Sequence, residues 1–250
     1  LMAAMDEFRE EREALKNAGL KKRISYFLYY YKWHVIIGIL VIAGVGSVVY
    51  EMVTSKDNAF YAVMLNATEL EPAAEFNQAF YDYAGIDLNE YNAFFDASIR
   101  ISSDTGMADS MTMTSVQKLA VYLAAAELDV MVTDSASIQQ YANSSAFYDL
   151  RDILSEEQIL QYEPYFYYVD MAVVRRIEES QTNLDDTYEP TYADPTKPED
   201  MAEPVPVGLY VDNAGLMESY YFSGEDVVIG VYSNTTHREA ALKFIDYLMN

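Results

Sequence analysis

Residues 115–133 read SVQKLAVYLAAAELDVMVT, and the interpretation of the whole chain starts from this stretch. Apolar side chains recur through 115–127 with helical spacing, which predicts a helix there. The segment DVMVT (129–133) is a short, nearly continuous apolar run and predicts a buried strand. A helix that leads directly into a buried strand is the repeating unit of an α/β fold. The inward side of the predicted helix carries Val116, Leu119, Ala120 and Leu123.

The same alternation continues in both directions along the chain. Four further segments predict strands: AFYAVML (59–65), residues 93–101, VPVGLYV (205–211) and DVVIGVY (226–232). Between and after them lie segments that predict helices, at 72–83, after residue 155 and at the C-terminus. Strands that are apolar almost throughout are typical of a sheet covered on both faces. The sequence therefore predicts an α/β sandwich with a largely parallel sheet.

The expected helix ends are marked by local signals. Phe76, Phe80 and Tyr83 share one face of the helix at 72–83, and Gly85 is placed to end it. The sequences 155–158 and 236–239 each match a capping box, in which a Ser or Thr side chain and a Gln or Glu three positions later satisfy the free amides of a helix start. The first of these helices should end near Pro164. The inward face of the last helix is predicted to be Ala240, Ala241, Phe244, Ile245 and Leu248.

A membrane anchor is expected near the N-terminus. VIIGILVIAGVGSVV (35–49) carries no charge, and the run extended to 33–53 would cover roughly 31 Å as a helix, about the thickness of the bilayer's apolar layer. Lys21, Lys22 and Arg23 precede it, and basic residues remain on the cytoplasmic side. We therefore expect a cytoplasmic, helical segment at 1–32, a transmembrane helix at 33–53 and an extracellular domain at 56–250. A cleaved signal peptide and a buried helix are the alternatives; no cleavage site follows the run, and the run has no polar face.

Charge and cysteine content restrict the function. The net charge is −24, and residues 56–250 hold nine Lys and Arg against 34 Asp and Glu. A domain this acidic repels nucleic acid, so no nucleic-acid partner is expected. The chain contains no cysteine, which excludes disulfides, thiolate metal sites and thiol nucleophiles. The domain must be held together by its core alone.

Two stretches resemble the extracellular solute-binding proteins of bacterial transporters, which have the periplasmic-binding type II fold. KLAVYLAAAELDVMVTDSASIQQYANSSAFYDLRDIL (118–154) is similar to their helix and strand ending in an acidic residue, followed by a short helix, a small-residue turn and a "DL…L" segment. PVGLYV…VVIGVYSNTTHREAALKFIDYLMN (206–250) is similar to their return strand and C-terminal helix. The family has two lobes with ligand between them, whereas only an acidic, Pro-bearing loop at 178–204 stands where a second lobe would follow. The resemblance therefore implies a single reduced lobe.

Ligands of open α/β sheets bind beyond the carboxyl ends of the strands, which defines the predicted ligand- or partner-binding site. Its residues are Ser103, Asp104, Thr105, Thr133, Asp134, Ser135, Asp212 and Asn213. Asp and Ser are also common helix caps, and capping is the competing interpretation of Asp134 and Ser135. A second candidate is an exposed aromatic patch formed by Tyr162, Tyr165, Phe166 and Tyr167, for which a place in the core is the alternative.

No catalytic centre, cofactor or metal is predicted. The two histidines, His34 and His237, have no nucleophile or metal partner that the sequence reveals. The carboxylates of the acidic loop lack the order of a calcium loop; they are Asp185, Asp186, Glu189, Asp194, Glu199, Asp200 and Glu203.

Three functions are compared on these grounds. The first is a non-enzymatic, membrane-tethered accessory or sensor domain that engages a partner protein such as a transporter complex. The second is a reduced receptor that delivers a small solute to a permease. The third, an enzyme, is supported only by the abundance of carboxylates. The first is the prediction, and whether a small molecule also binds is left open at this point.

Overall fold

The fold was obtained as a computed structural model. It describes residues 19, 33–34, 36–47, 49–50, 55–101, 110–143, 145–183, 187–222 and 226–250. The chain divides into two compact units, Leu1–Ser55 and Lys56–Asn250.

In the first unit, the described residues between 33 and 50 are helical. Within the described part of the chain, no helix combines the length and the apolar character needed to cross a membrane. The expected span at 33–53 is described only in part, because residues 35, 48 and 51–53 lie outside the described set. Of the expected cytoplasmic segment, residue 19 alone is described.

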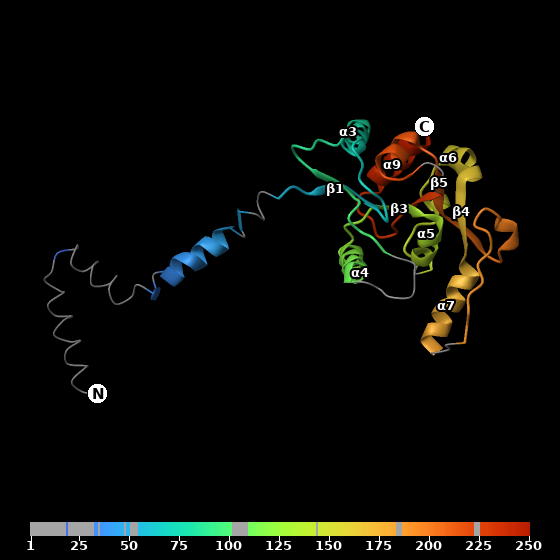
Figure 1. The fold of residues 1–250 in the computed structure, drawn as a ribbon, viewed down its shortest axis with the longest axis horizontal. Helices are drawn as coiled ribbons and strands as arrows, with labels where there is room; N and C mark the ends of the chain where they lie inside the picture. The colour runs from blue at the N-terminus through green and yellow to red at the C-terminus, as the bar shows by residue number, and fades with distance from the viewer. Residues whose placement is uncertain are drawn as a thin grey trace. The chain divides into compact units, whose positions relative to one another are not determined.

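The second unit is an α/β domain with a six-stranded mixed sheet (Figure 1). The strands are β1 (Asn58–Met64), β2 (Asn92–Asp96), β3 (Val130–Asp134), β4 (Phe166–Asp170), β5 (Pro204–Val211) and β6 (Val227–Val231). The helices are α3 (Ala73–Ala84), α4 (Ser110–Ala124), α5 (Ser135–Ala142), α6 (Glu156–Tyr162), α7 (Met171–Asn183), α8 (Ala214–Ser219) and α9 (Arg238–Met249). Short 3-10 turns lie at Leu150–Asp152, Glu163–Tyr165 and Pro198–Asp200.

The sheet order is β2-β1-β3-β6-β5-β4. The pairs β1–β2 and β1–β3 are parallel, whereas β3–β6, β6–β5 and β5–β4 are antiparallel. The α/β prediction is confirmed, and the parallel arrangement holds for one half of the sheet. The antiparallel half arises because β6 enters beside β3 in the opposite direction, and a strand's apolar pattern carries no information about its direction.

Helices cover both faces of the sheet, and the side chains of β1 show how. Phe60, Ala62 and Met64 enter the core cluster that α3 and α9 cover. Tyr61, Val63 and Leu65 enter the opposite cluster, where α4 and α5 contribute Leu119 and Ile138. Successive side chains of a strand point to opposite faces, so a strand buried on both sides must be apolar at every position. This explains the unbroken apolar run in the sequence.

Most predicted helix ends agree with the structure, and one does not. Gly85 ends α3 with φ 72°, a left-handed conformation that glycine adopts without strain. The Ser155–Gln158 capping box is formed at α6. The predicted box at 236–239 is absent, because α9 begins at Arg238 after His237, whose side chain makes no capping bond.

Two predicted inward faces also need correction. In α4, Leu119 is buried but Val116 and Ala120 are exposed. The side of the helix turned to the domain includes Ser115, whose hydroxyl accepts a hydrogen bond from the backbone N–H of Arg100. In α3, Phe76 and Phe80 are buried but Tyr83 is 52% exposed.

The acidic segment 178–204 is more ordered than the loop that the sequence predicts. Its first part continues α7 to Asn183, and residues 184–186 lie outside the described set. Its end is fastened to Asp170, whose carboxylate accepts hydrogen bonds from the backbone N–H groups of Ala202 and Glu203. Burial raises the pKa of Asp170, but these bonds outweigh it and lower the pKa.

A polar link between β2 and α4 gives the domain a measurable acid response. Asp96 accepts hydrogen bonds from the Tyr61 hydroxyl at 2.8 Å and from the Lys118 ammonium at 2.7 Å. Partial burial raises the pKa of Asp96, but the bonds from Lys118 and Ser98 outweigh it and lower the pKa to about 2. A carboxylate with a lowered pKa stabilises the fold above its unfolded-state pKa and loses that contribution as the pH falls through the folded value.

We therefore expect Asp96→Asn to lower the free energy of unfolding by about 2 kcal/mol at pH 5. The difference from the unmodified protein should shrink as the pH falls from 4 to 2, because the carboxyl of the unfolded chain is protonated over this range and that of the folded protein only near pH 2. Urea unfolding at several pH values measures this. A difference that stays constant down to pH 2 would show that Asp96 does not act through its charge.

Candidate functional site

The predicted binding edge exists as a geometric unit. In the register of the sheet, Asp134 pairs with Val227, and Val211 pairs with the same residue. The carboxyl ends of β3 and β5 therefore lie on the two sides of the start of β6. The loops after both strands meet at one end of the sheet, which we call the carboxyl edge, as the sequence predicts.

At β3, the predicted binding residues have structural roles. Thr133 is fully buried. The Asp134 carboxylate caps α5 by accepting hydrogen bonds from the backbone N–H of Ser137 at 2.8 Å and from its hydroxyl at 2.6 Å. Burial raises the pKa of Asp134, yet these bonds outweigh it and lower the pKa. The backbone N–H of Ser135 donates to the carbonyl of Asp226. Asp134 is thus the N-cap of α5, in agreement with the capping interpretation.

At β5, the two predicted residues differ. The side-chain oxygen of Asn213 caps α8 by accepting a hydrogen bond from the Leu216 N–H at 3.1 Å, while its amide nitrogen donates to the Leu248 carbonyl. Asp212 beside it is exposed. Among the predicted residues at these two strands, Asp212 is thus the one whose carboxylate faces solvent without a capping role. Ser103, Asp104 and Thr105 lie outside the described residues.

The predicted aromatic patch is wrong as a surface. Tyr162, Phe166 and Tyr167 are each at most 4% exposed, and Tyr165 alone remains outside, at 49%. The Tyr162 hydroxyl donates to the Asp246 carboxylate, and the Tyr167 hydroxyl donates to the Ser135 carbonyl. Phe166 and Tyr167 are buried because they begin strand β4, which pairs with β5, and Tyr162 is buried at the end of α6. Phe166 and Tyr167 are both buried, so β4 shows no simple alternation of exposure, and its consecutive aromatic residues gave no strand period in the sequence.

The carboxyl edge offers little room for a small molecule at its described pocket. This pocket is lined by Leu65, Ile101, Ala136, Ser137, Gln140 and Tyr141. It holds about 50 Å³, which is space for one or two water molecules rather than for a solute.

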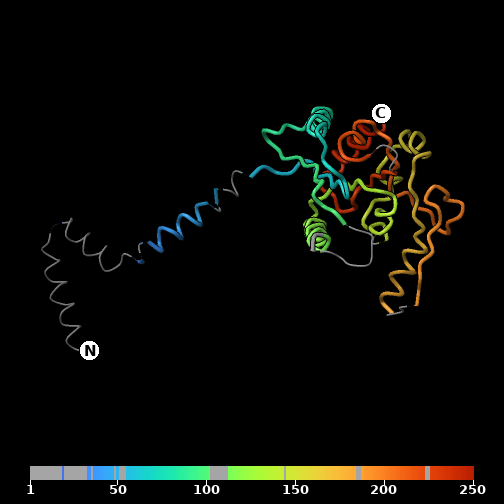
Figure 2. The backbone as a smooth tube through the Cα atoms, in the orientation of Figure 1, coloured from blue at the N-terminus to red at the C-terminus, as the bar shows by residue number. Residues whose placement is uncertain are grey.

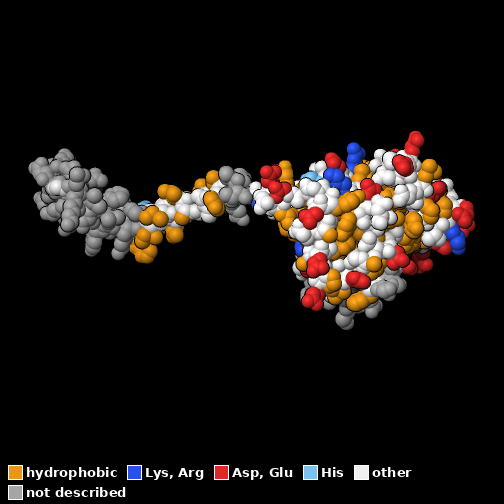
Figure 3. Space-filling model, turned by 90° about the horizontal axis from the view of Figure 1, so that it is seen from above, with side chains coloured by type: hydrophobic (Ala, Val, Ile, Leu, Met, Phe, Trp, Pro, Cys, Tyr) orange, Lys and Arg blue, Asp and Glu red, His pale blue; other side chains and the backbone are white. Residues whose placement is uncertain are grey.

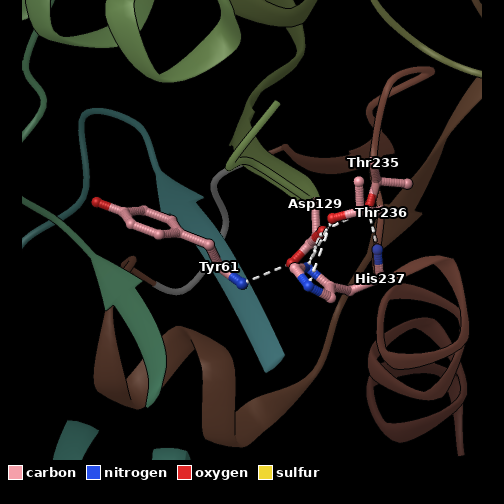
Figure 4. Close-up of polar contacts among 5 residues, drawn as sticks. All are labelled: Tyr61, Asp129, Thr235, Thr236 and His237. Carbon is pink, nitrogen blue, oxygen red and sulfur yellow. Dashed lines mark hydrogen bonds and ion pairs between the residues drawn. The ribbon is translucent and has the colours of Figure 1, made fainter. Parts of the chain in front are cut away.

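A polar cluster that the sequence did not reveal lies at the opposite end of the sheet (Figure 4). The fully buried carboxylate of Asp129 accepts a hydrogen bond from the Tyr61 N–H at 2.7 Å through one oxygen. Its other oxygen accepts a hydrogen bond from the Thr235 hydroxyl and lies 3.2 Å from Nδ1 of His237. The backbone N–H of His237 donates to the Thr235 hydroxyl at 3.0 Å. The cluster joins β1, β3 and the start of α9.

Asp, His and Thr side chains together suggest a nucleophilic triad, but the distances do not form one. The Thr236 hydroxyl lies 3.4 Å from both ring nitrogens of His237, so it does not lie along the lone pair of either. The Thr235 hydroxyl is engaged with Asp129 and not with the imidazole. A nucleophile is activated by a hydrogen bond to its base, and neither threonine hydroxyl is placed for one. The cluster therefore has the features of a structural contact that holds the start of α9 to the sheet. Its residues were missed because Asp129 and His237 are far apart in sequence.

Metal binding has no support in the described part of the chain, where no group of three or more His, Asp and Glu side chains is placed to hold an ion. Two of the seven loop carboxylates, Asp185 and Asp186, lie outside that part.

Comparison with known proteins does not assign this site. No protein-family model, curated protein or solved structure matches the chain. The function must therefore be argued from the chain's own residues.

Proposed function

We propose that residues 56–250 are a non-enzymatic binding domain, displayed outside a bacterial cell and held at the membrane by the segment 33–53. The domain engages a partner protein, such as a transporter complex, through its carboxyl edge. The resemblance of 118–154 and 206–250 to solute-binding proteins supports a role beside a transporter. The charge-free run at 35–49, with basic residues before it, supports the anchor and its orientation.

The carboxyl edge has the surface chemistry of a protein-docking site. Phe222 is 61% exposed and Tyr165 is 49% exposed. Phe222 belongs to this edge because its neighbour Tyr221 donates from its hydroxyl to the carbonyls of Leu65 and Val132, where β1 and β3 end. Tyr165 immediately precedes β4, whose first residue pairs with β5 near its end. Exposed aromatic side chains are enriched in protein interfaces, and the described pocket at this edge is too small for a solute.

The charge of the domain favours a basic partner surface. Figure 3 shows acidic side chains scattered over the visible face of residues 56–250, with few basic ones among them. Complementary charge steers association and fixes orientation more than it raises affinity. Asp212, exposed beside the end of β5, is the carboxylate that we place in the interface.

A cysteine-free chain allows one experiment to test both topology and docking. Asp212→Cys places a single thiol at the carboxyl edge, and Glu90→Cys places one on the exposed turn before β2, at the other end of the sheet. Intact cells that carry either full-length variant are treated with a membrane-impermeant maleimide bearing a photo-crosslinker. We expect both variants to be labelled, and only Asp212→Cys to give a discrete adduct with another protein.

The outcomes separate the two parts of the proposal. Labelling that requires cell lysis would overturn the extracellular placement. Labelling of both variants in intact cells with no adduct, or with the same adduct from both, would overturn docking through the carboxyl edge.

A further inference from the structure

A hollow that the docking proposal does not use lies on the face of the sheet that α5 covers. It lies between the end of α5, the middle of α7 and the segment 188–192, which we call the return segment. Figure 2 shows the chain running back beside α7 in this region. The hollow measures about 630 Å³, a size typical of ligand sites. Its lining consists of Gln140, Asn143, Ile177, Glu178, Ser180, Gln181, Tyr188, Pro190 and Tyr192.

The chemistry of this lining differs from that of the domain around it. The domain is strongly acidic, yet the hollow has a single charged side chain, Glu178. Three amides and two tyrosine rings dominate the rest. Primary amides donate and accept hydrogen bonds at the same time, which matches hydroxyl groups on a neutral ligand. A cationic or anionic ligand would find little complementary charge here.

One tyrosine ring, that of Tyr192, is fixed at its hydroxyl and is partly exposed. The amide nitrogen of Asn143 donates a hydrogen bond to the Tyr192 hydroxyl at 2.9 Å, and Gln139 in turn donates to the Asn143 carbonyl oxygen at 3.0 Å. Tyr192 is nevertheless 43% exposed. Its polar end is thus fixed to α5 while the ring borders the hollow. A ring that is already held in place loses little conformational entropy when a ligand binds, which favours binding.

The second ring and the amides complete the arrangement. The guanidinium of Arg176, on α7, lies 5.3 Å from the centre of the Tyr188 ring in the return segment, so this ring is held against α7 by a cation–π contact. In contrast, the side-chain amides of Gln140 and Gln181 make no hydrogen bond to the described part of the protein and are exposed. They are available to a ligand without breaking any internal contact.

From the fixed tyrosine rings and the unengaged amides around one hollow, we propose that this site binds a neutral carbohydrate. A sugar ring presents C–H groups on one face and hydroxyls at its edge, which match an aromatic face and primary amides respectively. The site shares only Gln140 with the pocket at the carboxyl edge and goes beyond the proposed docking function. It gives the domain a glycan contact whether or not a protein partner binds elsewhere.

Isothermal titration of the full-length chain with maltotetraose, cellotetraose and chitotetraose tests the site. The protein is kept in a polyoxyethylene detergent, because detergents with sugar head groups would compete. We expect at least one tetrasaccharide to bind more tightly than about 1 mM. Tyr192→Ala should weaken that binding about tenfold, whereas Tyr83→Ala, which removes a similarly exposed ring from α3, should leave it unchanged.

A second variant protects the test against misfolding. Gln181→Ala removes a side chain without hydrogen bonds in the described structure, so the fold should be unaffected while binding weakens several-fold. The proposal is overturned if no tetrasaccharide binds at concentrations ten times the expected limit of about 1 mM. It is also overturned if the substitutions at Tyr192 and Gln181 leave the affinity unchanged. Preferential binding of a neutral tetrapeptide would overturn it as well. None of these results depends on the crosslinking at Asp212.

Discussion

Asp129→Ala should lower the free energy of unfolding by about 3–5 kcal/mol, the largest effect expected of any polar substitution in the described domain. The Asp129 carboxylate is fully buried and is shared by the Tyr61 N–H, the Thr235 hydroxyl and His237. Removing it leaves a buried backbone N–H in β1 without a partner and frees the start of α9. Urea unfolding of the full-length chain, followed by near-UV circular dichroism, measures the loss.

Two further variants identify which contact matters. His237→Ala should cost about 1 kcal/mol, because the imidazole is 30% exposed and water replaces part of its contact. Asp129→Asn keeps an oxygen that can accept from the Tyr61 N–H. Its loss of unfolding free energy should therefore lie between those of His237→Ala and Asp129→Ala. If His237→Ala proved as damaging as Asp129→Ala, the ion pair rather than the buried hydrogen bonds would hold the cluster together, and our account of it would be wrong.

Gly208→Ala should destabilise the domain by about 2–3 kcal/mol through overpacking in the middle of the sheet. A Cβ atom at Gly208 would lie 2.8 Å from Cγ1 of Val228 and 2.9 Å from the carbonyl oxygen of Ile229. The valine is branched at Cβ and the oxygen belongs to the backbone of β6, so neither can move aside cheaply. Thermal and urea unfolding of the full-length chain report the change.

Gly85→Ala is the matched comparison, since both substitutions restrict the unfolded chain to the same extent. A Cβ at Gly85 meets no atom within 4 Å, and the cost there is the strain of φ 72°, about 1 kcal/mol. Equal losses from the two variants would mean that β5 shifts to admit the methyl group and that packing around Gly208 is loose.

Local sequence patterns correctly predicted those helices and strands whose deciding interactions lie within the pattern itself. The apolar runs at 59–65 and 129–133 correspond to β1 and β3, and Gly85 and Ser155 mark the helix ends that they predict. In each case the deciding interaction is local or lies within one element: burial on both faces of a strand, or a cap within four residues of a helix terminus.

The aromatic segment 162–168 shows where local evidence fails. Aromatic side chains fit an interface and a core equally well, so composition could not decide between them. Tertiary structure decided in favour of the core. Strand β4 pairs with β5, and the hydroxyl of its Tyr167 donates to the Ser135 carbonyl, while the Tyr162 hydroxyl of α6 donates to Asp246.

The sequence by itself determined the α/β class, the acidic and cysteine-free chemistry and the shared edge of the loops after β3 and β5. Three features depended on the tertiary structure alone. They are the antiparallel direction of β6, the contact between Asp129 and His237, which are 108 positions apart, and the hollow between α5 and the return segment. The physical reason is that helix periodicity and capping act over a few residues. Contacts between distant side chains instead depend on the order in which strands assemble, and no local pattern encodes that order.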